Sequence, residues 1–491
     1  MKEMNLHPTS LKVATCLHVK PVFVAPGLAT PLLATPLLAI ALLVTGCATP
    51  PPYQKPALEV PSAFKESSLW KVANSGAATV PDDWWLLFND PVLNDLQKQV
   101  VLGNENLKAA AAQVQVVRAA LGSSRAGLLP TFGASAGGAL SAVPGSSAAS
   151  RSYSAAANAT WELDLWGRVL GNVSGADARL QASAADLAAA RLSVQALLTQ
   201  TYFSLRAAEA QTALLDRSVA AYQRSRELTQ NRYAAGIVSA ADLAQAQTQL
   251  KSTQAQTVEA NSSRAQLEHA LATLLGKSPA LLALPRTAAL PAVPSIPLQL
   301  PANLIERRPD IAAAERRVAA ANAQIGVAQS AFFPAVTLSA TAGFRGSNLA
   351  QLLSAPNLFW SLGPALAATL FDGGARKSAE ESARATLDQV TASYRQTVLV
   401  ALQEVEDNLV IAASLEEQLV LQTDAFTAAQ RNLEITNNQY RAGIVSYLSV
   451  VTAQATALGA ERTLLDVRNR RLGAVTQLLK NLAGRWDDIK Q

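Results

Sequence analysis

The chain has very little cysteine, histidine and aromatic residue. Its 491 residues include two Cys, three His and 5% aromatic residues, and the two Cys are Cys16 and Cys47. Removal of a leader before Cys47 would leave one Cys and one His, so an internal disulfide and a Cys/His metal site are both excluded. The remaining histidine, His269, falls on a predicted amphipathic helix and is expected to be a partly exposed residue without a special role. We expect no metal and no cofactor.

Catalytic motifs and a strong charge bias are also missing. No nucleophile–base pair, phosphate-binding loop or metal-ligand cluster can be found, which argues against an enzyme. The net charge of +5 gives no reason to expect a nucleic-acid partner. The hydrophobic content of 49% comes largely from Ala and Leu and favours close-packed helices.

An internal repeat organises the chain. Residues 231–239 read N-R-Y-A-A-G-I-V-S, and residues 438–446, which lie 207 positions later, read N-Q-Y-R-A-G-I-V-S. Other stretches align at similar offsets: 106–130 with 310–334, and 164–168 with 372–376. Self-similarity of this length indicates two copies of one unit.

The repeated stretch is typical of a turn between two long helices. Proline-free segments at 168–233 and 376–440 precede it, each roughly 100 Å long as a helix, and segments 240–275 and 447–482 follow it. Helices of this length need partners, so coiled-coil packing is expected. Each turn is predicted to hold a Tyr that ends the first helix, a left-handed Gly and an N-cap Ser. These residues are Tyr233, Gly236 and Ser239 in the first copy, and Tyr440, Gly443 and Ser446 in the second. Ser239 with Asp242 also predicts a capping box.

Each copy has two segments in which apolar and polar residues alternate. They cover residues 131–142 and 155–164, then 336–345 and about 362–371. Alternation over about ten residues is typical of transmembrane β-strands, although a soluble hairpin would show it too. Glu162, Asp164 and Arg345 fall on the polar side and are expected to line a barrel lumen rather than face lipid.

The first 46 residues resemble a lipoprotein signal peptide. An apolar run at 28–44 ends in Val-Thr-Gly before Cys47, and the cysteine would carry lipid such as palmitate. Ala48 after the cysteine is typical of sorting to the outer membrane. The alternative is a transmembrane anchor with an incidental cysteine, but Pro31 and Pro36 interrupt the run.

The remaining boundaries follow from proline-rich stretches. We expect a lipid anchor and tether at 47–90, the first copy at 91–277, a linker at 278–302, the second copy at 303–484 and a tail at 485–491. The tether, with five prolines in 49–61, is expected to be extended and unpacked, with the aromatic residues at 84–88 anchoring it to the body. Helix breaks are predicted at Gly103-Asn104 and at Arg308-Pro309, the latter with local ion pairing.

Four strands per chain predict an oligomer. An open sheet edge is not tolerated in hydrocarbon, so the barrel must close between subunits. Eight strands would enclose a nearly filled interior, whereas twelve, from three chains, leave a water-filled bore. The expected fold is mainly α, with long helices continuing the wall of a transmembrane β-barrel into the periplasm.

The sequence resembles the TolC-like outer-membrane factors, specifically the lipoprotein branch typified by NodT and OprM. The stretches that carry the resemblance are the Trp-Trp of 84–85 with Phe-Asn-Asp-Pro at 88–91, Trp-Glu-Leu-Asp-Leu-Trp-Gly-Arg at 161–168, residues 307–326, Phe-Pro at 333–334, Phe-Asp-Gly-Gly at 371–374 and both turns. The resemblance implies a homotrimer in the outer membrane of a Gram-negative bacterium, with a twelve-stranded barrel on a helical tunnel. It also implies a periplasmic adaptor (membrane fusion protein), an inner-membrane pump of the RND type, and passive export of drugs or other small molecules.

The same resemblance implies a periplasmic gate near the two turns, which would also dock the adaptor. Asp242 and Arg441 are candidate gate residues and form a candidate pair between neighbouring chains; the alternative is that Asp242 only caps its own helix. The second copy departs from the family pattern. It has Ser449 and Thr452 where acidic residues are common, and Val445 where a polar one is common, so a thinner ionic latch is expected.

Two alternative functions remain at this point. The same duct could serve type I protein secretion, which the sequence does not exclude. A periplasmic adaptor or other helical scaffold would also have long hairpins, but it predicts one hairpin and a lipoyl-like domain instead of two copies with paired strands.

Overall fold

The two long helical hairpins dominate the computed structural model, which describes residues 52–58, 61–66, 80–142, 149–294 and 307–484. In the first copy, α4 (Arg168–Ala234) turns into α5 (Ala240–Leu274). In the second copy, α8 (Ala375–Arg441) turns into α9 (Tyr447–Leu482). The predicted boundaries of all four helices are confirmed to within one residue. None of the described helices is both long and apolar enough to cross a bilayer.

Three shorter helices pack along the long ones: α2 (Pro91–Gly103), α3 (Glu105–Ala126) and α7 (Pro309–Ser330). The predicted break at Gly103-Asn104 is confirmed, and the side chain of Asn104 explains it. Its Oδ1 accepts from the N–H of Leu107 and caps α3, while its Nδ2 donates to the carbonyl of Leu274 at the end of α5. Gly103 is needed because a Cβ there would lie 2.2 Å from the carbonyl oxygen of Leu275.

The break before α7 also follows the prediction. Pro309 is the first residue of the helix, where its missing N–H costs nothing. Arg308 binds Asp310 at 2.7 Å and Glu404 of α8 at 3.0 Å, so the local ion pair extends to a neighbouring helix.

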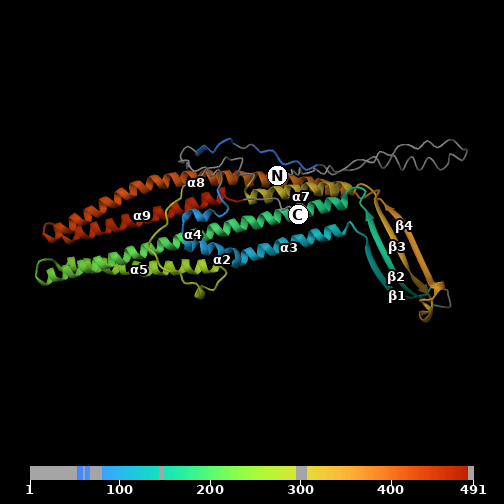
Figure 1. Ribbon diagram of the computed structural model, residues 1–491, viewed down its shortest axis with the longest axis horizontal. Coiled ribbons are helices and arrows are strands. Elements are labelled where there is room, and N and C mark those ends of the chain that lie inside the picture. Colours follow the sequence, from blue (N-terminus) through green and yellow to red (C-terminus); the bar gives the residue numbers. More distant parts are fainter. Residues whose placement is uncertain (1–51, 59–60, 67–79, 143–148, 295–306, 485–491) are drawn as a thin grey trace, which may run out of the picture. The chain divides into compact units, whose positions relative to one another are not determined.

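Four strands form one antiparallel sheet at the end of the helices opposite the two turns (Figure 1). They are β1 (Thr131–Ser141), β2 (Ser150–Leu163), β3 (Ala335–Gly346) and β4 (Leu358–Ala367), paired in that order. The prediction for the last strand, 362–371, was wrong by four residues. Its pairing begins at Phe344 with Leu358 and ends at Ala335 with Ala367, where β3 begins, so the apolar Leu370 and Phe371 lie beyond the strand.

The main hydrophobic core lies where the long helices meet α2 and the N-terminal segment. Trp84, Trp85 and Phe88 are buried in it, and Phe88 packs on Phe203 of α4 with ring centroids 4.8 Å apart. The anchoring role predicted for this aromatic cluster is therefore confirmed.

The tether is extended, as predicted, but the expectation that it is unpacked was wrong. Phe64 is buried in the core, and the phenol of Tyr53 donates to the carboxylate of Glu315 on α7. The N–H groups of Lys65 and Glu66 donate to the two oxygens of the Glu406 carboxylate on α8, at 2.8 and 3.0 Å. Prolines prevent regular structure in this segment but do not prevent docking. Cys47 and the leader lie outside the described residues.

A buried cluster of four ionised side chains joins α4 to α5. Glu209 accepts from Arg206 at 2.7 Å and from Arg264 at 3.1 Å, and all three side chains are less than a tenth exposed. Glu268 pairs with Arg264 at 2.7 Å. Because every charge has an opposite partner, the cost of burying them is offset.

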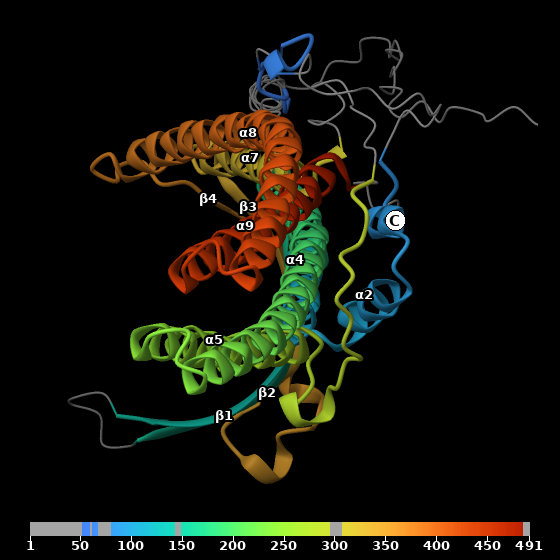
Figure 2. The same ribbon diagram turned by 90° about the vertical axis from the view of Figure 1, so that its left-hand side faces the viewer.

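The same cluster holds the linker that follows α5. Leu284 N–H donates to Glu268 at 2.9 Å, and Thr287 N–H donates to Glu209 at 3.0 Å. Burial alone would raise the pKa of Glu268, but the hydrogen bonds from Arg264 and Leu284 outweigh burial and lower it. Figure 2 shows this segment, with α2, on the side of α4 away from α9.

We predict that Glu209→Ala destabilises the protein by about 3–5 kcal/mol, because two arginines would be left buried without their shared carboxylate. The matched control is Glu461→Ala, which removes a partner from Arg217 on the surface and is expected to cost at most about 1 kcal/mol. The unfolding midpoints of the two variants in detergent, followed by helical circular dichroism, check this. Equal small shifts would contradict the role given to Glu209.

Candidate functional site

The four strands present one apolar face and one polar face, because their register keeps the alternation in phase. Trp161 of β2 lies opposite Leu338 of β3, and Leu338 lies opposite Pro364 of β4. Side chains on this face are apolar and exposed in the single chain, Phe132 by 81% and Trp360 by 75%. The other large residues of the face are Leu140, Tyr153, Phe344, Leu358, Leu362 and Leu366. Such a face suits a lipid environment.

Apart from Phe359 of β4, the opposite face carries small and polar side chains and a few charged ones, including Thr131, Ser135, Asn158, Thr160, Thr337, Ser339 and Thr341. Glu162 and Arg345 both fall on this face, as their positions in the alternation predict. Glu162 binds Arg168 at 2.7 Å, and Arg345 lies over the ring of Phe359 at 5.0 Å. The remaining charged strand residue, Arg151, falls on the apolar face but is the second residue of its strand, beside the loop.

Asp164 is not a strand residue, contrary to the prediction, because β2 ends at Leu163. Its carboxylate accepts from the N–H groups of Val169 and Leu170, at 3.0 and 2.7 Å, and so caps the start of α4. The repeat places Asp372 at the equivalent position, where it accepts from the N–H of Arg376 at 3.2 Å. Both copies therefore use an aspartate to join a strand to a long helix.

The outer strands β1 and β4 each have one edge without a partner in the single chain. In hydrocarbon, the N–H and C=O groups of such an edge would have no water to bind. With its apolar face in lipid, the sheet must therefore be closed by strands of other copies.

Both helix turns have the predicted left-handed glycine, with φ of +72° at Gly236 and +79° at Gly443. The capping box of the first copy is confirmed. Asp242 N–H donates to Ser239 Oγ at 3.2 Å, and Ser239 N–H donates to the Asp242 carboxylate at 3.0 Å. Ser446 is the N-cap residue of α9, as predicted, and has the backbone angles of an N-cap. The prediction that its side chain caps the helix was wrong, because the side chain makes no capping hydrogen bond. The box fails there because the third helical residue is Ser449 and not an acid.

The end of α4 is held against the end of α8 by Arg232. Its guanidinium donates to the carbonyls of Tyr440 and Arg441, both at 2.8 Å, and lies 4.6 Å from the centre of the Tyr440 ring. These carbonyls belong to the last turn of α8, where acceptors lack helical partners and a cation is favoured. We did not predict this contact from the sequence. The one sequence feature that could have pointed to this contact is a difference between the two copies: Arg232 aligns with the uncharged Gln439.

Hydroxyl groups extend this contact along α4. Tyr440 OH lies 3.4 Å from Thr229 Oγ1, Tyr447 OH lies 3.2 Å from Ser225 Oγ, and Tyr222 OH donates to the carbonyl of Gln454. Tyr440 and Tyr447 are buried with Val450 in a small core at this end. The predicted turn residue Tyr440 is therefore a contact between hairpins, whereas its repeat equivalent Tyr233 is exposed.

The four candidate gate residues, Asp242, Arg441, Ser449 and Thr452, lie at the helix ends beside the turns, and no hydrogen bond or ion pair joins any two of them in the described chain. The Asp242 carboxylate is engaged in its own capping box. Arg441 ends α8 with an exposed side chain, which has no ion pair or hydrogen bond among the described residues. Ser449 and Thr452 are exposed in the first two turns of α9.

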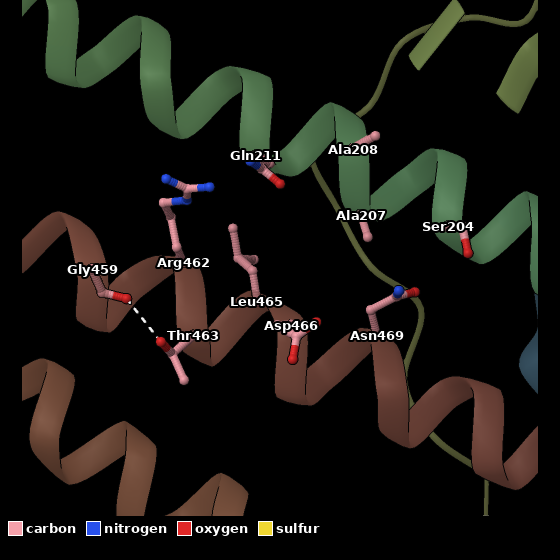
Figure 3. A pocket seen from close by; sticks show the side chains of 10 residues that line it. All are labelled: Ser204, Ala207, Ala208, Gln211, Gly459, Arg462, Thr463, Leu465, Asp466 and Asn469. Carbon is pink, nitrogen blue, oxygen red and sulfur yellow. Dashed lines mark hydrogen bonds between the residues drawn. The ribbon is translucent and has the colours of Figure 1, made fainter. Parts of the chain in front are cut away.

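A polar gap of about 590 Å³ separates α4 from α9 closer to the main core (Figure 3). Small residues, including Ala207 and Gly459, leave the space between the helices unfilled, and Arg462 points from α9 toward α4. Asp466 is the other ionisable residue of the lining, and no histidine or cysteine is present. The gap therefore offers no nucleophile–base pair.

An apolar-faced sheet with open edges, joined to two long helical hairpins, defines a subunit of an outer-membrane channel. The chain belongs to the outer membrane efflux protein family, whose family model matches residues 96–277 and 300–484. It is 30% identical over 453 residues to the probable efflux pump outer membrane protein TtgC of Pseudomonas putida, covering 90% of this chain and 94% of that protein. It is also 30% identical over 455 residues to the cation efflux system protein CusC of Escherichia coli, covering 90% and 96%.

The fold matches a solved outer-membrane channel, OprN, with a TM-score of 0.83 and 29% identity, covering 90% of this chain and all of that one. Outer-membrane efflux channels form trimers and work in tripartite pumps with an adaptor and an inner-membrane pump. The chain is therefore an outer-membrane efflux channel subunit, and its four strands are a third of a twelve-stranded barrel.

We predict that cysteine at Arg345 or Glu162 reacts with water-soluble thiol reagents in assembled channels, because we expect the polar face to line the lumen. Trp360→Cys on β4 is the matched control and should react only with lipid-soluble reagents. Mass shifts of the labelled subunits, compared with the unmutated protein, check this. The reverse pattern would mean that the sheet faces the other way.

Proposed function

We propose that the two helix turns form the periplasmic mouth of the channel and that contacts between the hairpins of each chain hold it closed. The observation that supports this is the position of Arg232, which binds the end of one hairpin to the end of the other. Charge-assisted hydrogen bonds of this kind contribute about 1.5–3 kcal/mol each. An interaction made at the extreme ends of long helices restrains the hairpins where their separation sets the width of the mouth.

The exposed turn residues are the surface we assign to the adaptor. Tyr233, Gly236, Ser239, Gly443 and Ser446 are all exposed, and both turns lie at the end of the helices farthest from the sheet (Figure 1). An adaptor that binds there could open the mouth by displacing Arg232 from its carbonyls. The resemblance to the lipoprotein branch supports an inner-membrane pump of the RND type.

The cargo we propose is a small molecule rather than a protein. Relatives are named for the efflux of antibiotics, toluene and cations, so the class of cargo varies among similar chains. The full-length resemblance to efflux ducts favours this reading over type I protein secretion.

We predict that Arg232→Ala raises the conductance of the channel in planar bilayers. Loss of about 2 kcal/mol from the closed form would shift its equilibrium with an open form about thirtyfold. Gln439→Ala, at the equivalent position of the second copy, is the matched control and should conduct like the unmutated channel. If both variants leave conductance unchanged, the turns are not the closed mouth.

The substitution Asp242→Ala distinguishes two roles for this carboxylate: capping its own helix, or pairing with Arg441 of a neighbouring subunit. Loss of the capping box should lower stability by about 1 kcal/mol and leave conductance unchanged. An increase in conductance, reproduced by Arg441→Ala and not additive with it, would instead assign the two residues to an ionic latch between neighbouring chains.

We also propose that Cys47 carries the lipid anchor, on the basis of the Val-Thr-Gly-Cys sequence after an apolar run. Mass spectrometry of the mature N-terminus is expected to find acylated Cys47, and an unmodified start elsewhere would exclude it. Cys47→Ser should still form channels, because the strands hold the protein in the membrane independently.

A further inference from the structure

The two turns differ in charge although their backbones match. The first turn has one cation, Arg232, and one anion, Asp242. The second has Arg441, and no Asp, Glu, Lys or Arg follows it from position 447 to position 460. Accordingly, α5 has an acidic residue in its first turn, whereas α9 has none. The end of the second hairpin is therefore electropositive.

Both charges of the first turn are engaged locally. The Asp242 carboxylate accepts from Ser239 N–H at 3.0 Å and from Ser239 Oγ at 2.9 Å. Arg232 donates to two carbonyls of α8. These hydrogen bonds leave both formal charges in place, and because the charges are of opposite sign the first turn is neutral overall.

Arg441 is in the opposite situation. Its side chain is exposed and has no ion pair or hydrogen bond in the part of the chain that the structure describes. Its backbone, however, is fixed, because its carbonyl accepts from Arg232 at 2.8 Å and the next residues form the turn around Gly443. The positive charge of Arg441 is thus fixed at the end of α8. The exposed residues that follow on α9, Ser449 and Thr452, add no charge.

We propose that Arg441 makes the mouth of the channel select for anions, so that anionic cargo and chloride enter more readily than cations. The proposal rests on the proposed function, in which the turns form the mouth, and it names Arg441 as a specificity-determining residue. Three subunits place three such charges around one opening. Their field reaches about 10 Å at 0.1 M salt and is focused by the protein wall, so it acts on passing ions whichever way the side chain points.

The size of the effect follows from screened electrostatics. Three unit charges within about one screening length (about 10 Å at 0.1 M salt) of a common axis raise the local chloride concentration there about two- to threefold and lower that of potassium by a similar factor. The permeability ratio of chloride to potassium should therefore lie clearly above one at low salt and approach one at about 1 M salt, where the screening length falls to about 3 Å.

The test measures reversal potentials of purified trimers in planar bilayers under a potassium chloride gradient. The unmutated channel is expected to prefer chloride, Arg441→Gln to lose most of this preference, and Arg441→Glu to prefer potassium. Arg431→Glu is the matched control, because it makes the same charge change on the same helix about 15 Å farther from the turn, and it should keep the preference for chloride.

A channel that prefers potassium, or one whose selectivity is unaltered in both Arg441 variants, would overturn the proposal. An equal shift in Arg431→Glu would also overturn it, because the effect would then belong to the general surface charge. Unchanged conductance in Arg232→Ala, by contrast, would overturn the proposed mouth, whatever the ion preference.

Discussion

Two unpaired strand edges impose the constraint on which the rest of the structure depends. The sheet buries its apolar face in lipid only if every backbone N–H and C=O group at β1 and β4 finds a partner, because hydrocarbon offers none. Closure by three chains satisfies these groups and leaves a bore lined by hydroxyls and amides. Two of the long helices, α4 and α8, are positioned by the sheet, because each begins within a few residues of a strand, at the carboxylate of Asp164 or Asp372.

The two ends of the helical wall are stabilised in different ways. Near the main core, side chains such as Trp84 and Leu198 are fully buried, and the cluster around Glu209 ties the linker to α4 and α5. Near the turns, the hairpins meet through hydroxyl contacts and one guanidinium, with only a small apolar core. The apolar core near the turns is much smaller than the main core, so we expect this end to separate more readily than the rest of the helical body.

The two copies of the repeat share one architecture, and the side chains that differ between their turns are the ones on which the proposed closing of the mouth depends. The matching turns produce two similar hairpins, each with a left-handed glycine. Two pairs of equivalent positions differ in charge: Arg232 corresponds to Gln439, and Asp242 corresponds to Ser449. Arg232 binds the first hairpin to the end of the second. Because Ser449 replaces an acid, Arg441 is left without a negative charge in its own turn.

The sequence by itself determined the features that depend on neighbouring residues: helix lengths, helix breaks, the capping box at Ser239, and the alternation that places apolar and polar side chains on opposite faces of the sheet. It located β4 poorly, because β4 ends opposite the first residue of β3, and that limit is a property of the pair of strands. Only the tertiary structure decided which distant groups meet. Arg232 binds carbonyls 208 and 209 residues away, Tyr53 reaches Glu315, and Glu209 receives the linker at Thr287. No local pattern encodes such contacts, because they depend on which surfaces face each other once the helices have packed.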